Sequence, residues 1–351
     1  MDSPHVWIIT DGKAGDLGPC LAVARAAHWE PEVWRLHSSG FWNAFMGPYR
    51  ITRDDSQNQA GQASPRDRNS SLSVHRLSPP MFPSSRYPDV LIASGRRTIP
   101  VVRLIRKWAK GKTFTVFLKD PRTVRPVADF TWVPEHDHLR GKGVYATLTT
   151  PHGLSPSFLQ DLRTHADLHT EAFALPKPRI AVLVGGNSRH HVFTASDQER
   201  LITHLSTLMD QGYHLMVTHS RRTPAPLKTA LLDLALANKC LVWDGATPNP
   251  YATFLALADY IIVTTDSINM MGEALATGRP LLLFEPQGGH RKIIQFTKIL
   301  KDKGYAFPFH GSMAGTAYPP VDSTPEVAAH MFEAFIHWKK GQKSSDNRVI
   351  G

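Results

Sequence analysis

The stretch from Thr264 to Pro280 combines polar, acidic and turn-forming residues at a spacing that could bind a nucleotide. Asp266 or Ser267 can cap a short helix, and Gly278 stands where a glycine commonly ends one. The N–H groups at the start of such a helix attract phosphate. Glu273 lies about one turn into the helix, where its carboxylate could accept both hydroxyls of a ribose. The stretch therefore predicts a nucleoside-diphosphate site; the alternative is an ordinary core helix with a surface glutamate.

A glycine-rich loop follows an apolar run in the second half of the chain. Gly185 and Gly186 allow the backbone to approach a phosphate closely, because glycine has no side chain. Asn187 and Ser188 supply hydrogen-bond donors, and Arg189 adds positive charge. The loop indicates a phosphate site, with an ordinary tight turn as the alternative.

A polar loop also follows the first apolar run and leads into a helical pattern. Gly12 and Gly15 suit the close approach of a ligand, although the spacing is neither that of a Walker A loop nor G-x-G-x-x-G. Asp11 or Asp16 could deprotonate an acceptor hydroxyl as a general base. Capping of the helix by Asp16 is the alternative to this catalytic role.

Two further loops place serine and arginine side by side after an apolar run. Ser94, Gly95 and Arg96 form one of them, and Ser220 and Arg221 belong to the other. Arginine at such a position suits a phosphate or a sugar carboxylate. A solvated basic edge is the alternative.

Apolar runs alternate with helical patterns in both halves of the chain. They lie at residues 6–10, 33–36, 90–93, 114–118 and 130–133, and again at 180–184, 215–218, 241–243, 260–263 and 281–284. Strands that alternate with helices form a parallel sheet covered on both faces. We therefore predict an α/β protein with two Rossmann-like, doubly wound parallel-sheet domains that face a cleft. The loops described above fall at the carboxyl ends of the expected strands, where such sheets bind ligands.

The length of 351 residues favours two domains. The expected parts are an N-terminal acceptor-side domain at 1–171, a proline-containing linker at 172–178, a nucleotide-sugar-binding domain at 179–323, a helix at 324–340 that crosses back to the first domain, and a frayed tail at 341–351. Residues 50–86 are polar and rich in turn formers, which predicts a disordered insertion in the N-terminal domain.

Composition restricts the partners and the compartment. The net charge of +10 indicates an anionic partner, and the basic residues are dispersed, which argues against a nucleic-acid-binding protein. The two cysteines show no paired pattern and the N-terminus resembles no secretory signal, so we expect a cytoplasmic protein. Adjacent His190 and His191 point apart and lack a carboxylate at ligand spacing, so no metal is expected.

Eight segments together resemble one family across nearly the whole chain outside the 50–86 insertion. They are 11–15, 93–98, 119–122, 133–137, 184–190, 220–224, 249–251 and 264–267. The family is the plant mitochondrial-fission family named for elongated mitochondria, with its bacterial homologues, and the resemblance implies a GT-B glycosyltransferase-like fold. Gly185 to Ser188, and Glu273 with Gly278 and Pro280, also resemble the donor site of the peptidoglycan N-acetylglucosaminyltransferase. The first loop departs from that enzyme, because it has no Gly-Gly-His.

The resemblance implies a metal-independent glycosyltransferase that takes a nucleotide sugar in its C-terminal domain and needs no cofactor. The alternative is a non-catalytic adaptor that acts at a membrane surface, with peripheral contact at the inner face, or with a protein partner. A short-chain epimerase is not expected, because G-x-G-x-x-G is absent and none of the eight tyrosines has a lysine four residues later.

Overall fold

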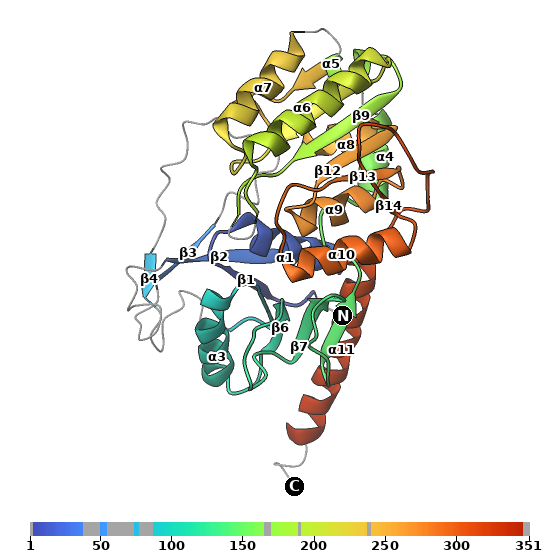
Figure 1. Ribbon diagram of the computed structural model, residues 1–351. Coiled ribbons are helices and arrows are strands. Elements are labelled where there is room, and N and C mark those ends of the chain that lie inside the picture. The colour runs from blue at the N-terminus through green and yellow to red at the C-terminus, as the bar shows by residue number, and fades with distance from the viewer. Residues whose placement is uncertain are drawn as a thin grey trace. The chain divides into compact units, whose positions relative to one another are not determined.

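The computed structural model describes residues 3–37, 50–54, 74–76, 87–164, 170–188, 191–236 and 240–346. Contacts between Cα atoms divide the chain into two compact units (Figure 1). Unit 1 contains Met1–Gly153 and Ser323–Gly351, and unit 2 contains Leu154–Asp322. The division at Gly153 comes earlier than the limit of 171 expected from sequence, because helix α4 (Pro156–Thr164) packs against helix α8 (Tyr251–Leu257) of unit 2.

The described residues of unit 1 form an eight-stranded sheet in the order β4-β3-β2-β1-β5-β6-β7-β8. The strands are β1 (Val6–Thr10), β2 (Pro31–His37), β3 (Arg50–Arg53), β4 (Val74–Arg76), β5 (Val90–Ala93), β6 (Phe114–Leu118), β7 (Phe130–Pro134) and β8 (Val144–Thr147). All neighbours are parallel except β2 with β3 and β3 with β4. The sheet is thus a parallel one with two antiparallel strands added at one edge.

Both faces of this sheet are covered, because alternate residues of each strand point to opposite sides. Val6 and Ile8 join a core cluster with residues of α1 (Ala14–Ala26) and α11 (Thr324–Asp346), whereas Trp7 and Ile9 join a second cluster with α3 (Ile99–Trp108) (Figure 1). Helix α11 therefore closes the core of unit 1 from the far end of the chain.

Strands β3 and β4 lie within residues 50–86, where the sequence predicts a disordered insertion. Arg35 of β2 pairs with Thr52 of β3, and Thr52 pairs with Val74 of β4. The expectation of disorder therefore does not hold for these two short segments, which extend the edge of an existing sheet. Asp54 is also described, and residues 55–73 and 77–86 lie outside the described residues.

The described residues of unit 2 form a six-stranded, wholly parallel sheet in the order β11-β10-β9-β12-β13-β14. Its strands are β9 (Arg179–Val184), β10 (His214–His219), β11 (Cys240–Val242), β12 (Tyr260–Thr264), β13 (Leu281–Phe284) and β14 (Ala306–Pro308). The other helices are α5 (Thr170–Ala174), α6 (Ala195–Asp210), α7 (Ala225–Ala235), α9 (Ile268–Leu275) and α10 (Arg291–Asp302). Residues of α6 and α7 pack with alternate residues of β9 and β10 in one core cluster (Figure 1).

The prediction of two doubly wound parallel α/β sheets is confirmed. Each sheet contains a point at which the strand order reverses, between β1 and β5 in unit 1 and between β9 and β12 in unit 2. Loops diverge there at the carboxyl ends of the strands, and this crevice is the usual ligand site of such sheets.

Candidate functional site

Asp266 is the centre of a hydrogen-bonded cluster at the reversal point of unit 2. Asp266 lies just after β12, and its side chain is 0% exposed. One carboxylate oxygen accepts from the Thr264 hydroxyl at 2.7 Å. The other accepts from the Gly186 N–H and from the Arg222 guanidinium, both at 3.0 Å. The carboxylate thus joins the carboxyl ends of β9, β10 and β12.

The glycines of the β9 loop are explained by this packing. A Cβ atom on Gly185 would lie 2.1 Å from an Asp266 carboxylate oxygen, and one on Gly186 would lie 2.1 Å from the Arg222 carbonyl carbon. The Gly185 N–H donates to the Thr264 hydroxyl at 2.8 Å. Both N–H groups therefore have acceptors inside the protein, and the close packing of the loops is by itself a reason for glycine here.

The remaining residues of these loops stabilise one another. The Asn187 N–H donates to the Arg222 carbonyl at 3.0 Å, and its side-chain oxygen accepts from the Phe193 N–H at 2.9 Å. The Ser220 hydroxyl accepts from the Arg222 N–H at 3.1 Å. Arg221 is exposed at the same turn. Among the predicted residues of these loops that the structure describes, Arg221 carries an exposed charged group that a ligand can reach.

Ser188 forms a small turn with His191. Its N–H donates to the His191 carbonyl at 2.9 Å, and its hydroxyl accepts from the His191 N–H at 3.1 Å. Arg189, which the sequence places in the phosphate loop, lies outside the described residues.

Helix α9 begins at the reversal point and contains Glu273, the residue predicted to bind a ribose. Ser267 caps the helix by accepting from the Met270 N–H at 3.4 Å. Further along, a carboxylate oxygen of Glu273 accepts from the Tyr251 hydroxyl at 2.6 Å. Burial raises the pKa of Glu273 to about 6, and the hydrogen bond from Tyr251 opposes this rise. No second donor to Glu273 is found in the part of the chain that the structure describes, so the carboxylate retains acceptor capacity.

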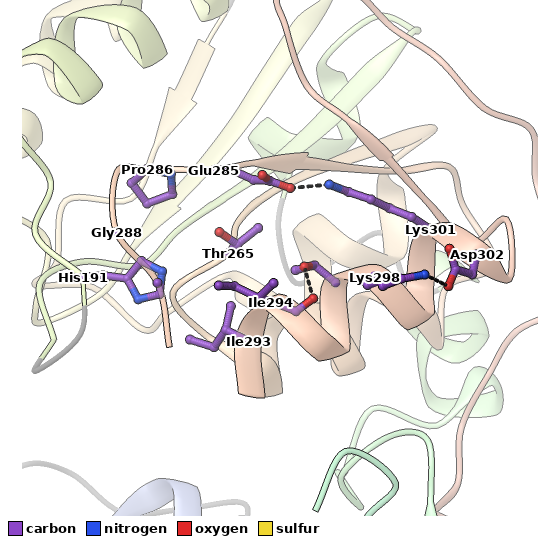
Figure 2. Close-up of a pocket in the computed structure, with 12 residues that line it drawn as sticks. His191, Thr265, Glu285, Pro286, Gly288, Ile293, Ile294, Lys298, Lys301 and Asp302 are labelled. Atoms are coloured by element: carbon purple, nitrogen blue, oxygen red, sulfur yellow. Dashed lines mark hydrogen bonds and ion pairs between the residues drawn. The ribbon is translucent and has the colours of Figure 1, made fainter. Parts of the chain in front are cut away.

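A cavity of about 400 Å³ opens beside this helix start. Figure 2 shows Thr265 and His191 on one side and the side chains of α10 on the other. Its polar end holds two ion pairs, Lys301 with Glu285 and Lys298 with Asp302. The volume is of the order that small-molecule sites occupy.

An aromatic pair stands at the ends of β10 and β11, and sequence reasoning did not single it out. The His219 and Trp243 rings lie 5.2 Å apart, and Gly245 contacts the imidazole closely enough that a Cβ would be 3.3 Å away. Burial, and then the charge of Lys228, lower the pKa of His219. Trp243 also lines a second cavity of about 520 Å³, beside Phe254 of α8.

Two other residues of the site were not chosen from sequence. Arg222 neutralises Asp266, and Tyr251 holds Glu273. The available signal was position: Arg222 follows the predicted Ser220 and Arg221 directly, and Tyr251 begins a helix that runs towards β12. Without the strand order, neither partner could be assigned.

Unit 1 gathers its predicted residues around Asp16. One oxygen of this buried carboxylate accepts from the Ser94 hydroxyl at 3.2 Å and from the Lys119 ammonium at 2.9 Å. A Cβ on Gly95 would lie 2.9 Å from the other oxygen. Lys13 is the N-cap of α1, and no side chain caps the helix there. Asp16 instead connects the loops that follow the strands.

The other predicted residues of unit 1 lie around this cluster. Asp11 pairs with Lys13, and the Gly12 N–H donates to the Thr10 hydroxyl at 3.1 Å. Gly15 and Arg96 are exposed, Arg96 in a 3₁₀ turn (Arg96–Thr98) directly after β5. The carboxylates of both candidate bases, Asp11 and Asp16, are therefore already engaged by lysine side chains.

The described residues include no group of three or more His, Cys, Asp or Glu side chains that could hold a metal ion. In the same ranges, no helix has the length and apolar character needed to cross a membrane.

Solved structures share the fold at low sequence identity. The UDP-GlcNAc 2-epimerase of Methanocaldococcus jannaschii matches with a TM-score of 0.53 and 9% identity, over 94% of this chain and 92% of that one. Its complex with UDP-GlcNAc and UDP matches with a TM-score of 0.52 and 11% identity, over 94% and 99%. The fold is GT-B-like. Because these epimerases share it, the sequence argument against an epimerase applies to short-chain epimerases and does not extend to this fold.

Two relatives match in sequence. The mitochondrial fission protein ELM1 of Arabidopsis thaliana is 28% identical over 269 residues, which is 70% of this chain and 63% of the relative. An uncharacterized protein of Rickettsia prowazekii is 34% identical over 161 residues, 42% of this chain and 44% of the relative. The match thus spans less than two thirds of the length of either relative. The model of the family described as "Mitochondrial fission ELM1" matches residues 14–335, and the chain belongs to that family.

Proposed function

We propose that this protein binds a nucleoside-diphosphate sugar at the carboxyl edge of the sheet in unit 2 and transfers the sugar without a metal ion. The observation that carries the proposal is Glu273, a partly buried carboxylate in the second turn of α9 that is held by a single phenol. A carboxylate in such a place binds a pair of hydroxyls strongly, because little water competes for it. The ribose of a nucleotide offers such a pair.

The phosphates would lie at the start of α9. Ser267 accepts from the Met270 N–H, which leaves the N–H groups of Ile268 and Asn269 at the positive end of the helix. The exposed guanidinium of Arg221 supplies a charge that can stabilise a leaving diphosphate. Gly185 and Gly186 would shape this site through Asp266, since their own N–H groups are engaged.

The sugar would occupy the cavity beside Thr265. The cavity combines polar groups at one end with Ile293 and Ile294 of α10, a pairing that suits the polar and apolar faces of a hexose (Figure 2). A structure of the same fold contains UDP-GlcNAc, which supports a nucleotide sugar as the ligand class. The acceptor would bind at the carboxyl edge of unit 1, with Ser94, Gly95 and Arg96 nearby and Asp11 or Asp16 as the base.

The test is a titration of the full chain with UDP, GDP, CDP, ADP and their common sugars, followed by calorimetry and thermal unfolding. At least one nucleotide or nucleotide sugar should raise the melting temperature of the protein, because a ligand that binds the folded state stabilises it. Glu273→Ala should weaken that ligand about tenfold or more, since it removes charge-assisted hydrogen bonds. Glu199→Ala, on the exposed face of α6, is the matched control and should bind as the natural chain does. If none of the nucleotides binds, the proposal is wrong.

A second candidate is a binding protein without transferase activity, as membership of a mitochondrial fission family allows. The observation in its favour is that Asp11 and Asp16 are both paired with lysine. Asp11→Asn and Asp16→Asn separate the two functions. A transferase should lose turnover in one of them while still binding donor, whereas an adaptor at a membrane or protein surface should tolerate both changes.

A further inference from the structure

Two arginines lie at the amino edge of the sheet in unit 2, next to the starts of the neighbouring strands β12 and β13. Arg163 lies near the end of α4, and Arg279 comes just before β13. The Arg163 Nε donates to the Ala256 carbonyl of α8 at 2.6 Å. The Ile261 N–H of β12 donates to the Pro280 carbonyl at 3.0 Å. These bonds hold both arginines at one corner, at the opposite end of the strands from the proposed nucleotide site.

Neither guanidinium has a carboxylate partner among the residues that the structure describes. Arg163 donates to the Ala256 carbonyl and, at 3.2 Å, to the side-chain oxygen of Gln160. The Nε atom of Arg279 is buried and forms no hydrogen bond within the described ranges. Both side chains are partly buried. An arginine in such a position usually has an anion beside it, because desolvation of an unpaired charge is costly.

The two charges also act on each other. Burial, and next the positive charge of Arg279, lower the pKa of the Arg163 guanidinium. Asp259, an acidic group at the same edge, is used elsewhere: it accepts from the Arg179 N–H at 2.9 Å and lies 3.9 Å from the Lys177 ammonium. The corner therefore contains two repelling cations whose charge the described part of the chain leaves unneutralised.

We propose that Arg163 and Arg279 form a binding site for a phosphate group, separate from the proposed nucleotide site. Two guanidinium groups supply paired N–H donors that match the oxygens of phosphate. A phosphate dianion would offset both positive charges, whereas a single carboxylate would offset one. The ligand class is free phosphate or a phosphate monoester.

The proposal is tested by thermal unfolding of the full chain in sodium phosphate and in sodium chloride of equal ionic strength, at pH about 7.5, where phosphate is largely dianionic. The melting temperature should be higher in phosphate. Arg279→Gln should weaken phosphate binding about tenfold, and Arg163→Gln should do the same. Arg279→Gln should also melt higher than the natural chain in chloride, because it removes the repulsion. Arg103→Gln, an exposed arginine of α3, is the matched control and should change neither value.

Two results would overturn the site. One is an equal melting temperature of the natural chain in phosphate and chloride. The other is a phosphate effect that survives Arg279→Gln but is lost in Arg221→Gln, since the anion would then bind at the proposed nucleotide site. The two proposals can fail separately, because nucleotide binding is scored by Glu273→Ala and phosphate binding by Arg279→Gln.

A further arm identifies the source of the phosphate. Glycerol 3-phosphate is titrated in solution, and vesicles that contain phosphatidic acid are offered in a flotation assay. Binding of the soluble ester that Arg279→Gln abolishes assigns the site to a small metabolite. Flotation that the same substitution abolishes assigns it to a lipid headgroup. Absence of both, with no effect of inorganic phosphate, refutes the site.

Discussion

The reversal points of the two sheets are built from the same parts. In unit 1, Asp16 faces Gly95, accepts from a serine hydroxyl and pairs with Lys119. In unit 2, Asp266 faces Gly185, accepts from a threonine hydroxyl and pairs with Arg222. In both places a buried aspartate joins loops that would otherwise diverge at the carboxyl edge.

The two clusters differ in how many of the carboxylate oxygens they use. The Ser94 hydroxyl and the Lys119 ammonium donate to the same oxygen of Asp16, whereas Asp266 accepts through both oxygens and takes a backbone N–H as well. The cluster in unit 2 is therefore the more constrained of the two. A ligand site that must hold a fixed geometry is better supported by the constrained cluster.

Replacement of the facing glycines should produce the largest difference between the units. Gly185→Ala puts a Cβ within 2.1 Å of a carboxylate that three donors hold in place, and should cost about 3 kcal/mol or more. Gly95→Ala meets a carboxylate oxygen at 2.9 Å and a positive φ of 85°, and should cost about 2 kcal/mol. Urea unfolding measures both. Equal losses would show that the two clusters are equally rigid.

Removal of the aspartate charge should give the next largest effect. Asp266→Asn turns an amide NH₂ towards groups that donate, because both of its oxygens accept, and should cost about 2–3 kcal/mol. Asp16→Asn can keep its single accepting oxygen and should cost about 1 kcal/mol. The measurement is the denaturant midpoint at a constant slope. A larger loss for Asp16→Asn would reverse the comparison.

Glu273 adds a pH dependence that unit 2 should show between pH 4.5 and about 6. Its pKa rises from 4.5 to about 6 on folding, so the folded state holds the proton more tightly. The contribution of Glu273 to the free energy of unfolding should be greatest below pH 4.5 and fall as the pH rises through about 6. Above that pH it should remain lower by up to about 2 kcal/mol. Glu273→Gln should abolish this decline and melt higher at neutral pH. A decline that persists in the variant would assign it to another group.

The cations of the two clusters should matter least. The Arg222 and Lys119 side chains are 44% and 54% exposed, so water can screen either charge. Arg222→Gln should still cost about 1 kcal/mol, because the guanidinium also donates to the Asn187 carbonyl at 3.1 Å. Lys119→Gln should cost a few tenths of a kcal/mol. Thermal unfolding at low and high salt measures both, and a loss for Lys119→Gln that grows in high salt would contradict the screening argument.

The fold was largely predictable because its strands are buried. Runs such as Val6–Thr10 and Arg179–Val184 are apolar on both faces, which is the mark of a central parallel strand. The edge strands were missed for the opposite reason. Val144–Thr147 is mostly half-buried and Ala306–Pro308 has three residues, so neither leaves a strong apolar pattern.

The sequence pointed to the loops of the candidate site but not to its bonds. Gly185 and Asp266 were chosen because they follow strands, and Glu273 because it lies about one turn into the next helix. The Gly186 N–H donates to Asp266 because β9 and β12 are neighbours in the sheet. These strands are separated by 75 intervening residues, so spacing along the chain does not reveal that they are adjacent. The close packing that requires glycine at 185 and 186 thus became visible only in the structure.

The position of α11 in unit 1 has a consequence for the order in which the two units fold during synthesis. Unit 2 is one continuous segment, Leu154–Asp322, whereas the core of unit 1 needs Val327, Met331 and Phe335 from the last helix. Translation delivers every residue of unit 2 before these three emerge from the ribosome. Unit 2 can therefore fold first, whereas one face of the sheet in unit 1 stays only partly covered, by α1, until the last helix has been synthesised.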